Sequence, residues 1–400
     1  MRARSAGSLP AGAAAARAAA RTVPRAGSPR TGRLAAGAPW LVLFLALAAA
    51  PLLAQSIAVT PAGTIVAAHD GVVDLYAADA KTRIWRAAGV PYSGAIAAGE
   101  KDIAVLDPID NRAVVIDLES GIPRPIRTGE TPIAAAFVGR DLYVLDRDAR
   151  IVERIAATGP RARVAVAADP AFMREDHGTL YVYSRTAGSL QEITLTPFAV
   201  SRSKPVAPFA SDLEISRHVA YLVYPTGSGV VLDASRFAKG GGVRKSSRSA
   251  GTIRTVDLTS MQAMSEVPVG AVPVDLALIV PPTPISAVMV AVADPSSRRV
   301  WMLEGEQSVA EATARGFLRG LIGLSANPAS ASIFESGVDR LSMNGSSSIA
   351  YDSSIGTLYR FSKGKSSVVA HGVAPNAFSA IPGGVAWWQD GTLVAQTDNR

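Results

Sequence analysis

Residues 142–155 read LYVLDRDARIVERI, a short apolar strand that ends at Asp146, then a tight turn, then a second apolar strand. The same pattern recurs along the chain, and the equivalent strand-end residues are His69, Asp107, Asp146 and Ser184. These positions are 38, 39 and 38 residues apart. A repeat near 40 residues that holds several strands is typical of a β-propeller, in which each repeat forms one blade.

Each repeat is expected to hold four strands, for example 93–98, 103–107, 113–118 and 123–128. A proline stands just before the first strand of most repeats, where a residue that cannot donate to a strand ladder is tolerated. These prolines are Pro91, Pro132, Pro170, Pro208, Pro273 and Pro375. Tyrosines at matching places, Tyr143, Tyr181, Tyr221 and Tyr351, are expected to pack between blades.

The number of blades depends on where residues 56–60 belong. Extending the strand-end positions through Tyr224, Asp294, Asp352 and Gln389 gives seven complete repeats and an incomplete eighth. If residues 56–60 open the first blade, the ring has eight blades and the last has three strands. If they complete the last blade, seven blades result. We predict an all-β protein built as a single β-propeller of seven four-stranded blades, with eight as the close alternative.

Two intervals between strand ends are too long for one blade and predict insertions, at about residues 226–251 and 305–335. The first is rich in Gly, Ser, Arg and Lys, and its low hydrophobicity favours a flexible surface loop. The second contains residues 308–324, where Ser308 and Glu311 form a capping-box pattern, so we expect one short helix there.

The first 54 residues contain seven arginines and no acid, followed by an apolar run from Trp40 to Leu53. This order is typical of a secretory signal peptide with a long basic n-region. The apolar run is shorter than the roughly 20 residues that span a bilayer. We therefore expect an exported bacterial protein, periplasmic or extracellular, whose mature domain covers residues 55–400 and has no stable membrane span.

Removing the leader changes the charge balance of the chain. Of the 40 Lys and Arg residues, seven are in the leader, so the expected mature part contains 33 basic and 33 acidic residues. A formally neutral body gives no support for nucleic-acid binding, which needs a basic face. The chain has no cysteine, so burial and not disulfides must hold the domain together.

The segment from Thr131 to Asp146, TPIAAAFVGRDLYVLD, resembles the repeat of bacterial propellers of the YVTN and NHL type. Residues 100–118 are a second match. WD40 proteins fit less well, because no Trp-Asp or Gly-His pair recurs at the blade ends. The resemblance implies the propeller fold and a periplasmic or surface setting, and it assigns no functional residue. Some similar propellers are lactonases or lyases.

Several strand-end positions carry carboxylates, and equivalent positions form a ring on one face of a propeller. A ring of Asp107, Asp146, Asp294 and Asp352 could hold Ca²⁺, which prefers hard oxygen ligands. The alternative is that these aspartates only shape tight turns, because the Asp side chain bonds the backbone two residues on. Tyr92, His69 and Arg185 are the further candidates for an axial ligand site. We expect no cofactor, with Ca²⁺ as the alternative.

The four histidines, His69, His177, His218 and His371, are scattered over different repeats, and no pair has the spacing of metal ligands. The sequence therefore does not predict a histidine metal site. It also lacks the Gly-x-Ser-x-Gly motif and any phosphate-binding glycine loop.

Two functions fit these observations. The favoured one is an exported, monomeric, non-catalytic propeller that presents a rigid face to a protein or glycan, and it predicts exposed aromatic or apolar side chains on that face. The alternative is a lactonase-like hydrolase or lyase that acts on a small molecule at the axis, with a divalent cation as a further option. It predicts polar residues that converge in one pocket and include acids with shifted pKa values.

Overall fold

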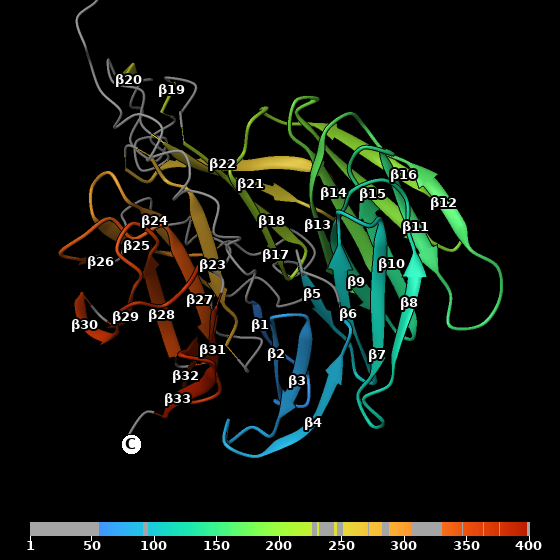
Figure 1. The fold of residues 1–400 in the computed structure, drawn as a ribbon. Helices are drawn as coiled ribbons and strands as arrows, with labels where there is room; N and C mark the ends of the chain where they lie inside the picture. Colours follow the sequence, from blue (N-terminus) through green and yellow to red (C-terminus); the bar gives the residue numbers. More distant parts are fainter. Residues whose placement is uncertain are drawn as a thin grey trace, which may run out of the picture. The chain divides into compact units, whose positions relative to one another are not determined.

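The computed structural model describes residues 56–90, 95–225, 230–231, 244–245, 251–270, 272–281, 288–305, 330–345, 347–362, 364–375 and 377–397. The predicted leader, the candidate Tyr92, the predicted helix at 308–324 and most of the 226–251 insertion lie outside these residues. Within them the secondary structure is entirely strands, turns and loops, which confirms the all-β prediction (Figure 1).

The strands form eight blades in chain order, each an antiparallel sheet. Blade 1 holds β1 (Ser56–Val59), β2 (Ile65–His69), β3 (Val72–Tyr76) and β4 (Arg83–Ala88). Blade 2 holds β5 (Ile96–Ala98), β6 (Asp102–Asp107), β7 (Arg112–Asp117) and β8 (Pro123–Arg127). Blade 3 holds β9 (Pro132–Val138), β10 (Asp141–Asp146), β11 (Ile151–Ile155) and β12 (Ala162–Ala165). Blade 4 holds β13 (Pro170–Asp176), β14 (Thr179–Ser184), β15 (Ser189–Leu195) and β16 (Phe198–Pro205).

The second half of the ring departs from this regularity in blades 5 and 8. Blade 5 holds β17 (Asp212–Ser216), β18 (Val219–Tyr224), β21 (Thr252–Asp257) and β22 (Gln262–Pro268). Blade 6 holds β23 (Asp275–Ile279), β24 (Met289–Asp294), β25 (Arg299–Glu304) and β26 (Ser330–Ile333). Blade 7 holds β27 (Arg340–Asn344), β28 (Ser347–Asp352), β29 (Thr357–Ser362) and β30 (Lys365–Ala370). Blade 8 has three strands, β31 (Phe378–Ile381), β32 (Gly384–Gln389) and β33 (Thr392–Thr397).

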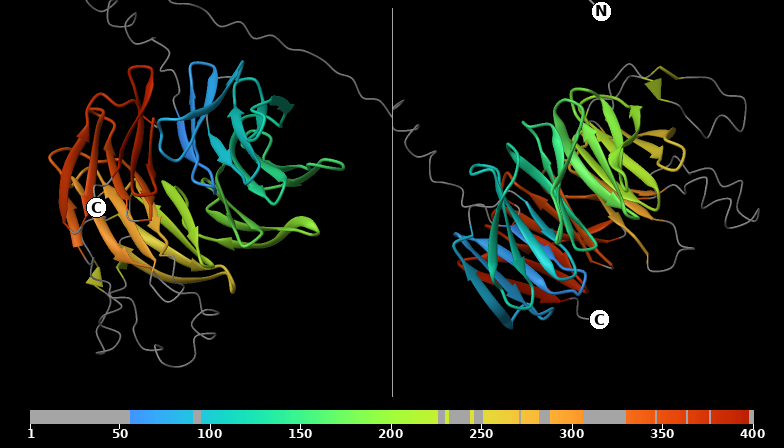
Figure 2. Two further views of the ribbon diagram at one scale, coloured as in Figure 1. Left: turned by 90° about the horizontal axis from the view of Figure 1, so that it is seen from below. Right: turned by 90° about the vertical axis from the view of Figure 1, so that its right-hand side faces the viewer.

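The β-propeller is thus confirmed, and of the two blade counts that the sequence leaves open, eight is the one observed. Strand β1 pairs with β2 inside blade 1 and does not complete the last blade. Blades 1 and 8 lie beside each other in Figure 2, in blue and red. Side chains close the ring there, since Ile65 and Ala67 share an apolar cluster with Trp387 and Trp388.

The distribution of burial follows the strand order within a blade. The second strands are almost wholly buried, as in β18, whereas an outer strand such as β4 is mostly exposed. Because the chain has no cysteine, packing of apolar strands between neighbouring blades is the main driving force for folding. The recurring tyrosines, from Tyr351 at 0% exposure to Tyr181 at 4%, are in this core, as predicted.

The antiparallel blades define two faces of the ring. Turns between the second and third strands lie at the same end as the connections from one blade to the next, and we name this end the connection face. Turns between the first and second strands, and between the third and fourth, lie at the opposite end, the hairpin face. Asp70 and Gly71 illustrate a connection-face turn, with φ of 46° and 78°. Two successive positive φ angles are typical of the type I′ hairpin turn.

Both predicted insertions fall between strands of one blade. The first separates β18 from β21, and its described part is a two-stranded ladder of β19 (Val230–Val231) and β20 (Arg244–Lys245). The second separates β25 from β26. Residues 330–333, which the sequence assigns to this second insertion, are the outer strand of blade 6.

Candidate functional site

The strand-end aspartates are bonded to the turns that follow them. Asp107 accepts the backbone N–H groups of Ile109 and Asp110, both at 3.1 Å, and the Nε–H of Arg112 at 3.0 Å. Asp294 accepts the hydroxyls of Ser296 and Ser297. Asp352 accepts the N–H of Ser354 at 2.9 Å. These contacts are those of aspartates that shape tight turns, which is the alternative that the sequence offers to a calcium-binding ring.

Asp146 has a different environment from the other strand-end aspartates. It is completely buried, and no side chain of the described residues hydrogen-bonds to its carboxylate, which lies against the backbone of Gly129. A Cβ at Gly129 would stand 2.6 Å from its Oδ2, so only glycine allows this close approach. Burial, and then the negative charge of Glu153, raise the pKa of Asp146 from an ordinary 3.8 to about 7.

His69 and Arg185 occupy different settings. His69 is 7% exposed at the seam between blades 1 and 8, where its ring stacks on Trp388 at 3.7 Å and bonds to the Asp74 carboxylate at 3.0 Å. Arg185 is exposed on the connection face, with its guanidinium 5.9 Å from the centre of the Phe172 ring. These two candidates thus lie in different settings, one buried at the seam and one exposed on the connection face.

A large cavity, about 1110 Å³, is instead lined by the first strands of blades 4 to 7. Its polar wall carries Arg174 on β13, Asp212 and Glu214 on β17, Asp275 on β23 and Arg340 on β27. First strands line the axis of a propeller, so this is the axial cavity. Of the strand-end aspartates, Asp352 is among its lining residues.

Hydrogen bonds connect neighbouring blades along the cavity wall. Arg174 Nη2 donates to Glu214 Oε1 at 2.8 Å, from blade 4 to blade 5. The Asp212 carboxylate accepts the N–H of Leu276 at 3.0 Å, from blade 5 to blade 6. The Asp275 carboxylate accepts the N–H of Leu341 at 2.6 Å, from blade 6 to blade 7. Each acid thus bridges two blades and also contributes charge to the cavity.

The electrostatics of the wall are set by burial and by close charges. Burial raises the pKa of Glu214, which the Arg174 guanidinium opposes. Burial, followed by the charge of Asp212, holds the pKa of Asp275 well above its usual range. Burial alone would lower the pKa of Arg174, but the negative charges of Glu214 and Asp212 have the larger effect, so the Arg174 pKa is raised. Acids with raised pKa values in a cavity are a common property of functional sites.

Three exposed apolar side chains lie on the connection face, each one or two residues from a residue that lines this cavity. Phe209 is 62% exposed, Ile355 53% and Val272 40%, and we name these three residues the mouth patch. Ser211, two residues after Phe209, lines the cavity and donates to the Pro273 carbonyl at 3.4 Å. Ile355 follows Ser354, which also lines it. Ile109, 76% exposed, lies on the same face in blade 2.

Sequence reasoning missed the axial acids and the mouth patch. A signal for the acids was present, since Asp212 and Glu214 are two residues apart in an otherwise apolar strand and therefore point to one side. Nothing local distinguishes Phe209 or Ile355 from core residues. The sequence analysis also treated His177 and His218 as scattered, yet the structure brings them together with Asp176.

No protein-family model matches this chain. No curated protein matches it either. Among solved structures, BamB from Moraxella catarrhalis is 10% identical, with 86% of this chain and 92% of that chain covered and a TM-score of 0.54. The WD40 domain of Pan2 from Neurospora crassa is 12% identical, with 74% and 86% covered and a TM-score of 0.50.

A third similar structure is an enzyme. The dihydro-heme d1 dehydrogenase NirN, in complex with DHE, is 14% identical, with 80% of this chain and 66% of that chain covered and a TM-score of 0.54. At such identities the similarities show the β-propeller fold alone. A fold that is common to a WD40 domain and a dehydrogenase does not select a function. In the described part of the chain, no helix could cross a membrane.

Proposed function

We propose that this chain is an exported, non-catalytic β-propeller that binds a protein partner through its connection face. The observation that carries the proposal is the exposure of the mouth patch, Phe209, Val272 and Ile355, on the connection face, one or two residues along the chain from residues that line the axial cavity. Exposed apolar groups on one face are what the sequence-based binding hypothesis requires. A protein fits better than a glycan because two of the three side chains are aliphatic and cannot stack on a sugar ring.

The energetics of the patch suit a specific protein interface. Burying a Phe or Ile side chain is worth roughly 1.5–3 kcal/mol. The connection face that carries the mouth patch also borders the axial cavity, whose acids and arginines could hydrogen-bond to an inserted segment of the partner. An apolar rim with a few fixed polar groups supplies both affinity and orientation. Since the mature chain is formally neutral, we expect its partner binding to depend weakly on salt.

The proposal is tested by quantitative affinity capture with matched variants. Phe209→Ser combined with Ile355→Ser removes the mouth patch. Ile84→Ser combined with Val368→Ser removes two side chains of similar exposure, 51% and 47%, from the outer strands β4 and β30. We expect a protein captured by the wild type to be lost with the first pair and retained with the second. Equal capture by both pairs would contradict the assignment of the connection face.

Export and family membership are parts of the same proposal. The basic leader and apolar run support cleavage near Ala54, and the repeat at 131–146 supports membership of the YVTN and NHL type propellers. Mass spectrometry of the mature protein from the periplasm or medium tests the first point. A new N-terminus near Gln55 is the expected result, and an intact leader on a cytoplasmic protein would contradict it.

A second candidate, a hydrolase or lyase at the axis, is favoured by the axial cavity itself. Burial raises the pKa values of Glu214 and Asp275, the direction of shift that a general acid requires. The contacts of Asp212 and Asp275 to backbone N–H groups fit a structural role equally well. Turnover of lactones that is lost with Glu214→Gln in a folded protein would favour this candidate over the binding proposal.

A further inference from the structure

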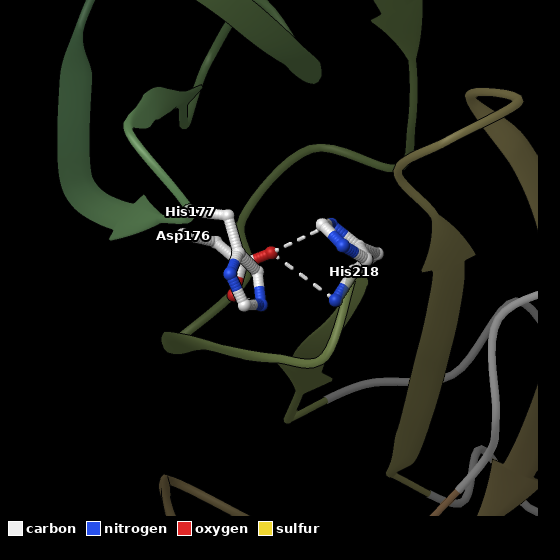
Figure 3. Close-up of side chains that lie close together, drawn as sticks. All are labelled: Asp176, His177 and His218. Carbon is white, nitrogen blue, oxygen red and sulfur yellow. Dashed lines mark hydrogen bonds and ion pairs between the residues drawn. The ribbon is translucent and has the colours of Figure 1, made fainter. Parts of the chain in front are cut away.

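Two turns of the hairpin face bring a carboxylate and two imidazoles together. Asp176 ends β13, and His177 follows it in the turn to β14. His218 is in the turn between β17 and β18 of the next blade. Figure 3 shows the Asp176 carboxylate next to the His177 side chain and facing His218, to which its dashed contacts run. The three side chains thus come from two blades, and His218 is 41 residues after His177 in the sequence.

The distances among these groups suit a shared ion. One ligand atom from each residue can be chosen so that all three lie within 4.8 Å of one another. His218 Nδ1 is 3.0 Å from Asp176 Oδ2, and His177 Nε2 is 3.8 Å from Asp176 Oδ1. The centres of the two imidazole rings are 4.5 Å apart. Small rotations of the two rings would bring their nitrogens to the roughly 2.0–2.1 Å at which imidazole binds zinc.

The carboxylate is fixed, whereas the imidazoles face solvent. Asp176 is 9% exposed, and its Oδ2 also accepts the backbone N–H of His218 at 3.1 Å. His177 is 64% exposed and His218 35%. Because the carboxylate is held by the backbone of the neighbouring blade, the three groups are already close before any ion binds. Their exposed side leaves room for a further ligand.

We propose that Asp176, His177 and His218 form a zinc-binding site that bridges blades 4 and 5. Two imidazole nitrogens and a carboxylate oxygen are a common ligand set for Zn²⁺, and three protein ligands leave a fourth position for water or for a group from another molecule. The site is on the hairpin face and is separate from the mouth patch. It adds a metal to the function proposed above and does not depend on it.

The backbone of both turns explains which substitutions can test the site. His177 and Gly178 have φ of 49° and 77°, and Arg217 and His218 have 51° and 61°. Such two-residue turns favour Asn and Gly, which tolerate positive φ. His177→Asn and His218→Asn therefore remove an imidazole while keeping a residue that suits the turn. His371→Asn is the matched control, because His371 is exposed and bonds to Thr357, away from the cluster.

The test is calorimetric titration of the full chain, purified without a histidine tag, with Zn²⁺ alone. We expect one Zn²⁺ per chain for the wild type and for His371→Asn. Loss of a direct ligand should weaken binding by more than the roughly 10–100-fold that follows loss of an outer-shell partner. His177→Asn and His218→Asn should each show this loss. Saturating Zn²⁺ should also raise the Tm of the wild type and leave both variants unchanged.

Circular dichroism spectra that match the wild type would show that the variants are folded, so weak binding could not be attributed to unfolding. Co²⁺ gives an independent readout, since its visible absorption reports coordination by nitrogen and oxygen in a four-ligand site. The proposal would be overturned if the wild type takes up no Zn²⁺ under these conditions. Equal weakening by all three histidine variants would overturn it as well, because that pattern indicates binding to scattered surface histidines.

Discussion

Asp146→Asn is a substitution whose effect on stability should change with pH. The Asp146 carboxyl is fully buried in blade 3 against the Gly129 backbone, without a side-chain hydrogen-bond partner among the described residues and close to the charge of Glu153. These surroundings raise its pKa from 3.8 to about 7. Asparagine has nearly the same shape and no proton to lose. The substitution therefore removes the titration while it preserves the packing.

The sign and size of the effect follow from linkage. With a pKa near 3.8 in the unfolded chain and about 7 in the native protein, the native state binds the proton more tightly. The free energy of unfolding therefore falls as pH rises from about 4 to 7, and the whole penalty is present above pH 7. The difference between 7 and 3.8, at about 1.36 kcal/mol per pKa unit, corresponds to about 4 kcal/mol.

The assay is urea unfolding, followed by tryptophan fluorescence, between pH 4 and pH 8. Relative to the wild type, Asp146→Asn should gain about 4 kcal/mol over this range, whatever the difference at pH 4. Asp107→Asn, at the equivalent position of blade 2, is the control. It loses the Arg112 contact and should destabilise the protein at neutral pH by roughly 1–3 kcal/mol. A constant difference between Asp146→Asn and wild type across the pH range would refute the reasoning.

Three further predictions concern the seam, the cavity wall and the connection face. Trp388→Ala should cost roughly 3–5 kcal/mol in urea unfolding, because it empties the seam beside His69; a cost below 1 kcal/mol would mean that blades 1 and 8 contribute little by packing. Arg174→Gln leaves Glu214 without its partner and should destabilise the protein by roughly 1–3 kcal/mol at pH 7. The loss should be smaller at pH 5, because more of the Glu214 carboxyl, whose pKa is raised, is protonated there. Thermal melts at both pH values check this, and an equal loss of stability at the two pH values would argue against a charge effect. Phe209→Ser should leave the Tm within about 1 °C of the wild type, since this side chain is mostly exposed; a larger fall in a calorimetric scan would show that Phe209 supports the fold.

The sequence was sufficient for the fold because the propeller repeats one local pattern. The predicted strands 103–107 and 123–128 differ from β6 and β8 by one residue at one end. The sequence could not decide whether residues 56–60 open the first blade or complete the last one, because either pairing buries the same apolar residues of this strand. The structure has the first arrangement, since β1 pairs with β2 from Ser56 opposite Ala68 to Val59 opposite Ile65.

The candidate sites were harder to predict because they depend on which turns become neighbours. Asp176 and His218 are in different repeats, and only the lateral packing of blades 4 and 5 brings them to 3.0 Å. The same holds for Arg174 and Glu214 on the cavity wall. Asp146 shows the reverse case, since its position in the repeat resembles that of Asp107 while its buried surroundings raise its pKa.

The central claim, that the connection face binds a protein, is tested most directly by photo-cross-linking in the cell. A photoreactive amino acid is placed at position 209 or 355 and, for comparison, at the outer-strand positions 84 and 368, which have similar exposure. We predict that positions 209 and 355 give adducts with the same protein and that positions 84 and 368 do not. Adducts with that protein from all four positions, or from the outer strands alone, would contradict the account.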